Sequence, residues 1–191
     1  MNELITIFLG LVLINNFILV RFLGLCPFFG VSKKLGSAVS MGIAVTFVMT
    51  LASIATWVIR HYILTPFNVE YMNIIIYILV IATLVQIIEL FIKRTNLALY
   101  NAFGIYLPLI TVNCAVLGVT LIEAAENYSL LGSVAAALGG GLGFTLVLAM
   151  MSGIREKLEM ANAPKAMKGV PIAFLTAMLL GLAFLGFGGI I

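Results

Sequence analysis

Charged residues are scarce in this sequence. Only 9% of its 191 residues are Asp, Glu, Lys or Arg, and 63% are hydrophobic, whereas about a quarter of a soluble domain is charged. No water-soluble surface can be built from this composition, so we predict an integral membrane protein. The net charge of +3 does not indicate a nucleic-acid partner, because the basic residues are scattered over short loops, where they record membrane topology.

The sequence also lacks a signal-peptide pattern and contains few cysteines. The N-terminus, Met1-Asn2-Glu3, lacks the positively charged region of a cleaved signal peptide, so the first apolar run is predicted to remain as a membrane span. Cysteine occurs only twice, as Cys26 and Cys114, and both lie in or beside apolar segments. A disulfide framework is therefore not expected.

Six apolar stretches are long enough to cross a hydrocarbon core of about 30 Å, which takes about 20 residues. They cover residues 4–29, 37–59, 71–92, 98–122, 130–152 and 170–190. The segments between them leave no room for a soluble domain, so residues 1–191 form a single membrane domain. Because backbone in lipid must satisfy its own hydrogen bonds, the predicted fold is all-α and polytopic, with six transmembrane helices.

The loops predict the orientation of these helices. The first, third and fifth loops hold eight basic residues, namely Lys33, Lys34, Lys93, Arg94, Arg155, Lys157, Lys165 and Lys168. The opposite side has Arg60, accompanied by Glu3, Glu70, Glu123 and Glu126. By the positive-inside rule, these three loops are cytoplasmic and both termini are extracytoplasmic.

The two halves of the chain, approximately 1–95 and 96–191, resemble each other. Each has one Cys-x-x-x-Gly, at Cys26–Gly30 and at Cys114–Gly118, followed by Leu-Gly-Ser, at 35–37 and at 131–133. Three spans per half is an odd number, so the second half must enter the membrane from the other side. The sequence therefore predicts two inverted three-helix repeats, related by a pseudo-two-fold axis in the membrane plane.

The first and fourth spans correspond in this arrangement, and both are predicted to be interrupted. Gly24 and Pro27 lie in the first, and Gly104 and Pro108 lie in the fourth. Proline removes an amide donor and disfavours helical backbone before it. Paired interruptions of this kind indicate a central site between repeats, although the same residues could also only kink ordinary spans.

The two thiols have two possible interpretations. A single membrane cysteine is usually a small hydrophobe, but a pair at corresponding interruptions suggests a metal site. Two thiolates do not complete an iron or zinc site, which needs about four ligands. If Cys26 and Cys114 bind metal, a second polypeptide must therefore contribute the remaining ligands.

The segments around both thiols closely resemble the A-subunit family of Rnf complexes, which are ion-translocating ferredoxin:NAD⁺ oxidoreductases. The similar segments are 15–17, 22–28, 30–35, 47–53, 107–118 and 153–157. The E subunit of the sodium-pumping NADH:quinone oxidoreductase belongs to a sister family and shares much of this pattern. Asn15-Asn16 and Pro27 favour the Rnf family.

The resemblance implies a role in electron transfer. The chain would pair with a homologous, oppositely oriented E subunit, and each would give two cysteines, here Cys26 and Cys114, to one shared [2Fe–2S] cluster. Electrons would pass from ferredoxin to NAD⁺ through the complex, whose other subunits are B, C, D and G, while Na⁺ or H⁺ leaves across the bacterial or archaeal cytoplasmic (inner) membrane. This chain shows no nucleotide, soluble-ferredoxin or flavin-attachment motif, so it is an enzyme subunit without a complete active site.

Two other functions remain possible on the sequence alone. A stand-alone secondary transporter would also have inverted repeats, but it would place charged or strongly polar residues at the interruptions. A structural anchor would have inert cysteines. The interruptions hold chiefly thiols, Asn and Arg21, which favours the electron-relay function.

The remaining polar and small residues have modest interpretations. Glu89 lies about one turn from Lys93 and Arg94, and an interfacial ion pair is favoured over an ion path. Arg21 faces the interruption or extends to the cytoplasmic surface. His61 and Trp57 are interfacial anchors rather than a metal site. The rows Gly132, Ala136, Gly140 and Ala135, Gly139, Gly143 predict close helix packing.

Overall fold

The computed structural model describes residues 2–32, 34–67, 70–95, 113–160 and 169–186, which form helices and turns. The helices are α1 (Asn2–Leu9), the π-helix η1 (Gly10–Ile14), α2 (Leu25–Val31), α3 (Leu35–Ile59), the π-helix η2 (Arg60–Leu64), α4 (Thr65–Phe67), the 3-10 helix η3 (Glu70–Met72), α5 (Asn73–Thr95), α8 (Cys114–Ala125), α9 (Leu130–Met160) and α10 (Val170–Leu185).

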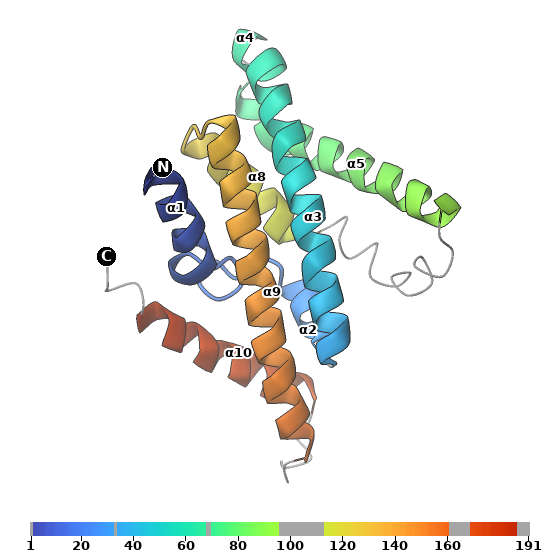
Figure 1. Ribbon diagram of the computed structural model, residues 1–191, viewed down its shortest axis with the longest axis vertical. Coiled ribbons are helices and arrows are strands. Elements are labelled where there is room, and N and C mark those ends of the chain that lie inside the picture. The colour runs from blue at the N-terminus through green and yellow to red at the C-terminus, as the bar shows by residue number, and fades with distance from the viewer. Residues whose placement is uncertain (1, 33, 68–69, 96–112, 161–168, 187–191) are drawn as a thin grey trace.

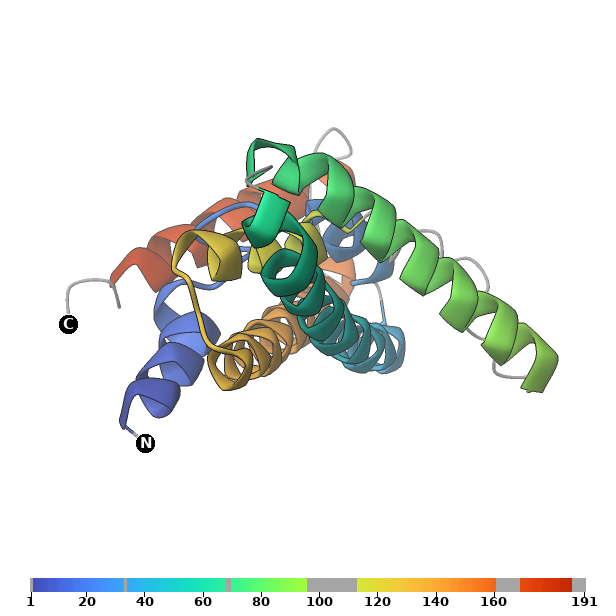
Figure 2. The ribbon, with the colours of Figure 1, turned by 90° about the horizontal axis from the view of Figure 1, so that it is seen from above.

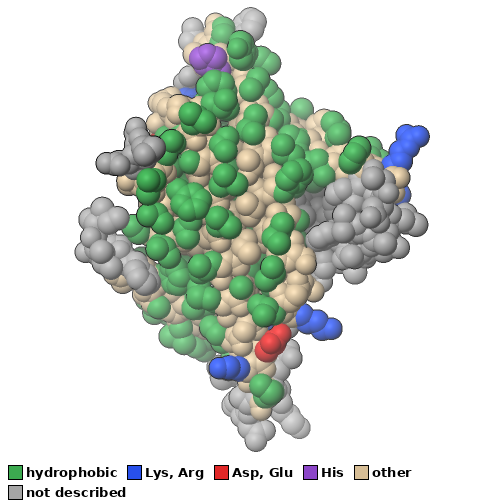
Figure 3. Space-filling view, in the orientation of Figure 1, with side chains coloured by type: hydrophobic (Ala, Val, Ile, Leu, Met, Phe, Trp, Pro, Cys, Tyr) green, Lys and Arg blue, Asp and Glu red, His purple; other side chains and the backbone are tan. Residues whose placement is uncertain are grey.

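Long apolar helices confirm the polytopic membrane protein that the composition predicts. Three helical segments, Leu35–Leu64, Asn73–Phe91 and Leu130–Leu158, are long and apolar enough to cross a membrane. Shorter apolar helices cover Leu4–Ile14, Cys114–Ala125 and Val170–Leu185. Large apolar side chains are exposed along α5 and α10 and over much of the face in Figure 3, as a protein surrounded by lipid requires.

The centre of the molecule is an antiparallel pair, α3 and α9 (Figure 1). The Leu35 N–H lies 3.4 Å from Glu156 Oε1 at one end, and the Trp57 indole donates to the Tyr128 carbonyl at the other. From this pair α5 and α10 extend to opposite sides, as the view from above also shows (Figure 2).

Two glycine–threonine contacts set the close approach of α3 and α9. A Cβ on Gly42 of α3 would lie 2.5 Å from Oγ1 of Thr145 on α9, and a Cβ on Gly141 of α9 would lie 2.6 Å from Oγ1 of Thr46 on α3. Each threonine hydroxyl donates to the carbonyl of the glycine four residues earlier on its own helix, at 2.8 Å. Each glycine therefore makes room for a threonine side chain of the other helix, which lets the two helices approach closely.

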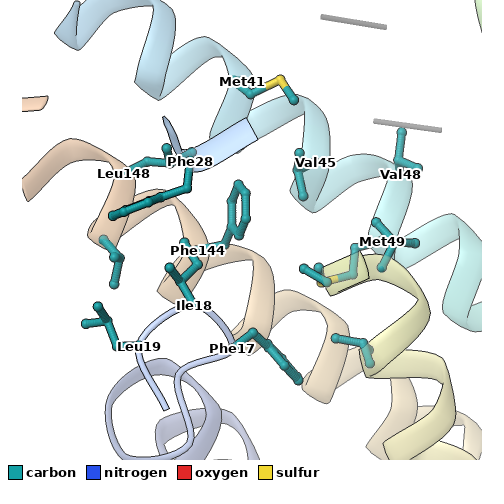
Figure 4. Close-up of a cluster of buried hydrophobic side chains, with 14 of the residues drawn as sticks. Phe17, Ile18, Leu19, Phe28, Met41, Val45, Val48, Met49, Phe144 and Leu148 are labelled. Atoms are coloured by element: carbon teal, nitrogen blue, oxygen red, sulfur yellow. The ribbon is translucent and has the colours of Figure 1, made fainter. Parts of the chain in front are cut away.

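The hydrophobic core fills the space between this pair and the first interrupted segment. Phe17, Phe28, Met49, Phe144 and Leu148 are each at most 1% exposed and come from the chain before α2, from α2 itself, from α3 and from α9 (Figure 4). Residues 16–19 of the interrupted segment are thus packed in protein.

Candidate functional site

The first predicted interruption is present. The helix that begins with α1 ends at Ile14, and helix resumes only at Leu25. Asn16, which is fully buried, donates through Nδ2 to the Val12 carbonyl at 3.2 Å and the Gly143 carbonyl at 3.0 Å, and its Oδ1 accepts from the Ile18 N–H. One amide side chain therefore attaches the non-helical backbone to α9 and supplies hydrogen bonds that the missing helix would have made.

The interruption lies earlier than the Cys-Pro step that the sequence emphasises. Residues 15–24 are non-helical, while Cys26 and Pro27 belong to the first turn of α2. Proline is tolerated there because amides of the first turn have no carbonyl partner within the helix. Pro27 therefore marks the restart of the helix, and Gly24, with φ of 82°, is the residue that turns the chain into it.

The second thiol also lies at the start of a helix. Cys114 is the first residue of α8, and Asn113 caps this helix by accepting the Ala115 N–H through Oδ1 at 3.0 Å. The predicted second interruption rests on Gly104 and Pro108. Both residues lie outside the described part of the chain.

The two helix starts that carry the thiols are in contact. A Cβ on Gly24 would lie 3.1 Å from the Ala115 Cβ and 3.2 Å from Asn113 Oδ1. The Leu23 side chain packs in the same way against Gly118 of α8. Only a residue without a side chain permits this approach, and the approach brings together segments that lie about 90 residues apart in the sequence.

Both thiols are free and exposed on this chain. Among the described residues, no group of three or more His, Cys, Asp or Glu side chains is arranged to hold a metal ion. Beside Cys114, the buried Asn113 Nδ2 has no hydrogen-bond partner. Two accessible sulfurs with an unsatisfied donor next to one of them would suit half of a thiolate-bound cluster, if a second chain supplied the other ligands.

The far end of α2 is fixed by an arginine that the sequence assigns to a loop. Arg155 lies within α9, is 8% exposed, and donates to the Phe29 carbonyl at 3.0 Å and to Ser32 Oγ at 2.9 Å. The loop assignment of Arg155 is wrong because α9 extends to Met160. Arg155 holds the last turn of the helix that carries Cys26.

Three other predicted residues occupy different surroundings. Arg21 is exposed in the interrupted segment, and Glu89 is partly buried on α5, where its ion pair stays a prediction. His61 stacks on Trp57 with ring centroids 5.1 Å apart, and the interfacial position of this pair stays a prediction.

The predicted close packing of the small-residue rows is confirmed on α9. A Cβ on Gly139 would lie 2.8 Å from the Phe8 carbonyl oxygen, and a Cβ on Gly140 would collide with the Phe17 ring. This face of α9 therefore receives α1 and the interrupted segment.

One buried acidic residue was missed by the sequence analysis. Glu123 was assigned to an outer loop, but it lies on α8, is 5% exposed, and has both carboxyl oxygens 2.7 Å from Ser53 Oγ on α3. The predicted span ends at residue 122, three residues before the end of α8 at Ala125. No local pattern links two residues separated by 70 positions.

These features define an all-helical membrane protein with an interrupted helix and two exposed thiols at adjoining helix starts. The family model for Rnf-Nqr subunits, described as membrane proteins, matches residues 4–191. The chain belongs to this family.

Similar proteins cover the chain almost from end to end. The A subunit of an ion-translocating oxidoreductase complex from Azoarcus sp. is 53% identical over 190 residues, which is 100% of this chain and 98% of the relative. The A subunit of an Na⁺-translocating ferredoxin:NAD⁺ oxidoreductase complex from Acetobacterium woodii is 52% identical over 97% of each chain. A proton-translocating counterpart from Clostridium ljungdahlii is 48% identical over 100% of this chain and 99% of the relative.

Proposed function

We propose that this chain is the A-type membrane component of an ion-translocating ferredoxin:NAD⁺ oxidoreductase in the cytoplasmic membrane. In this proposal Cys26 and Cys114 supply half of the ligands of a [2Fe–2S] cluster, and a homologous, oppositely oriented E subunit supplies the other half. Subunits B, C, D and G complete the complex, and the reactions with ferredoxin and NAD⁺ take place on those partners.

The contact between the two thiol-bearing helix starts carries the proposal. Gly24, two residues before Cys26, packs directly on the side chains of Asn113 and Ala115, the two residues that flank Cys114. Both thiols are exposed. A site completed by a partner requires this combination, because sulfurs buried within one chain could not share a metal with another chain.

The surroundings of Cys114 also suit a group that carries negative charge. The first N–H groups of α8 have no carbonyl partner within the helix, and the positive end of the helix dipole lies there. Asn113 Nδ2 is a buried donor without a partner. When bound, the cluster would accept and pass on single electrons, and these donors would offset part of its negative charge in the low-dielectric membrane.

The packing of α3 and α9 supports the proposed inverted repeats. Gly42, Thr46 and Ser53 on α3 have the same spacing as Gly141, Thr145 and Ser152 on α9. Each glycine faces the other helix's threonine. A pseudo-two-fold axis between the two helices would produce this reciprocal contact between equivalent residues.

Electron paramagnetic resonance of the purified, reduced complex tests the electron-relay function. We expect a rhombic [2Fe–2S] signal that is lost in Cys26→Ala and in Cys114→Ala, while the complex still assembles. Gly30→Ala serves as the matched control, because it lies on α2 and a Cβ there meets nothing within 4 Å. A full signal in the double cysteine variant would contradict the proposal, and ion transport by the isolated chain would favour a stand-alone transporter.

A further inference from the structure

A second polar site lies at one end of the core, far from Lys34 and Lys157. The loop charges assign this end to the outer side of the membrane. Its centre is Glu123 of α8, whose partner is Ser53 of α3. Both are buried, at 5% and 0% exposure. The cysteine site makes no use of either residue.

The hydrogen bonds of this pair leave room for a proton on the carboxyl. Ser53 Oγ lies 2.7 Å from Glu123 Oε1 and also 2.7 Å from Oε2, yet a hydroxyl carries only one proton. If the carboxyl is protonated, one of its oxygens donates to Ser53 Oγ and the other accepts the serine proton. Both short contacts are then ordinary hydrogen bonds.

Two neighbouring hydroxyls are engaged with the backbone. Thr56 Oγ1 donates to the Ala52 and Ser53 carbonyls, at 2.8 and 3.1 Å, and Thr120 Oγ1 donates to the Leu117 carbonyl at 2.9 Å. Ser53 is therefore the hydroxyl partner of the carboxyl on α3.

A cavity of about 10 Å³ adjoins the carboxyl, and it is lined by Glu123, Ser133 and Arg60. Ser133 Oγ is fully buried without a hydrogen-bond partner, and so is Arg60 Nε. A cavity of this size holds about one water molecule when two or more polar groups face it. Here a donor, a hydroxyl and a carboxyl face it.

This cavity is next to a larger recess of about 270 Å³. Trp57 and Arg60 line both spaces, and His61, Asn127 and Tyr128 line only the recess. A proton on Glu123 thus has a short route outward, through one water molecule and past the Arg60 side chain.

The small space around the carboxyl favours a proton over a metal cation. Arg60, from η2, lines the cavity and places a positive charge there, and its terminal nitrogen donates to Asn127 Oδ1 at 2.7 Å. Tyr77 from α5 also lines the cavity, while Tyr128 and Glu126 lie in the turn after α8. A proton needs no further ligands in a space for about one water, whereas a metal cation would need several oxygen ligands around it.

We propose that Glu123 is a proton-binding site at the outer end of the chain, with Ser53 as its hydrogen-bond partner and the Ser133–Arg60 cavity as its outlet. On release, the carboxyl O–H bond breaks and the proton passes to the cavity water. The carboxylate that remains still accepts the Ser53 hydroxyl, and Arg60 stabilises its charge. This site deepens the proposed ion-translocating function but does not depend on the cysteines.

Infrared difference spectra of the whole complex, recorded while the pH is raised, test this site. We expect a carboxylic-acid carbonyl band that shifts in D₂O, is lost in Glu123→Gln, and moves to higher frequency in Ser53→Ala, which removes its hydrogen bond. Glu126→Gln is the matched control, because Glu126 is exposed only three residues further on. A band that is unchanged in Glu123→Gln, or absent from the wild-type complex at every pH, would overturn the proposal.

Two further measurements separate the possible failures. Loss of the band on adding Na⁺ at constant pH would show that the site binds sodium, which also overturns the proposal. The [2Fe–2S] resonance should persist in Glu123→Gln, so the proton site and the cluster are judged by separate readouts. If Glu123→Gln does not assemble, the frequency shift in Ser53→Ala decides the question, and an unshifted band contradicts the assignment.

Discussion

Replacing Gly24 by alanine should separate the two thiol-bearing helix starts. The new Cβ would lie 2.8 Å from Phe144 Cε2 and 3.1 Å from the Ala115 Cβ, and the backbone there has φ of +82°. An L-residue in the left-handed region costs about 1–2 kcal/mol. Overpacking a well-filled core costs about 1–3 kcal/mol, so we expect Gly24→Ala to lower the free energy of unfolding by about 2–5 kcal/mol in total.

The strain should also change the cysteine site. The Phe144 ring belongs to the fully buried core and has little room to move. The adjustment therefore falls on the contact between α2 and α8, which displaces Cys26 relative to Cys114. We expect Gly24→Ala to weaken or broaden the [2Fe–2S] resonance in complex that still assembles.

Gly30→Ala provides the comparison, because it makes the same chemical change within α2, six residues after Gly24. Its Cβ would meet nothing within 4 Å, so its stability should stay within about 1 kcal/mol of wild type. Denaturant unfolding of the purified chain in detergent and the resonance of the reduced complex measure both effects. If Gly24→Ala matches Gly30→Ala in both, Gly24 does not hold the two helix starts together.

Two more predictions concern the support of the site. Arg155→Met should remove both hydrogen bonds at the end of α2, to the Phe29 carbonyl and to Ser32. Hydrogen bonds to charged donors contribute about 1.5–3 kcal/mol each. We therefore expect the free energy of unfolding to fall by about 3 kcal/mol and proteolysis near α2 to begin earlier. Gly42→Val should force its side chain into Thr145 and lower the thermal midpoint of the protein by several degrees, since it separates α3 from α9.

Each of these variants has a control on its own helix. Lys157→Met removes an exposed positive charge from α9, and Gly36→Val adds the same side chain to α3 where a Cβ meets nothing within 4 Å. If Arg155→Met and Lys157→Met have the same stability and the same proteolysis pattern, the contacts from Arg155 to α2 contribute little to stability. Equal thermal midpoints for Gly42→Val and Gly36→Val would mean that the α3–α9 crossing tolerates a larger separation.

The sequence predicted the features that depend on local composition. Apolar length identified the long helices, and Asn, Gly and Pro identified the first interruption, because these residues act on the backbone where they stand. The position of the interruption was less accurate. Pro27 is compatible with a first helical turn, so it could not show that the turn into α2 occurs at Gly24.

The contacts that assemble the site could not be predicted in this way. The approach of Gly24 to Asn113, the bonds from Arg155 to α2, and the Glu123–Ser53 pair all join distant parts of the chain. A lone Glu at the end of an apolar stretch usually marks a membrane surface. Only the depth of α8 beside α3 shows that Glu123 lies inside.

The crossing of α3 and α9 restricts how this protein can move. Where glycine meets threonine on both helices, each short threonine side chain packs directly on the glycine of the other helix. Tightly packed contacts of this kind deform little. We therefore expect the central pair to behave as a rigid frame, so that in the proposed function a rearrangement coupling electron transfer to ion transport would fall on the segments around the crossing rather than on the crossing itself.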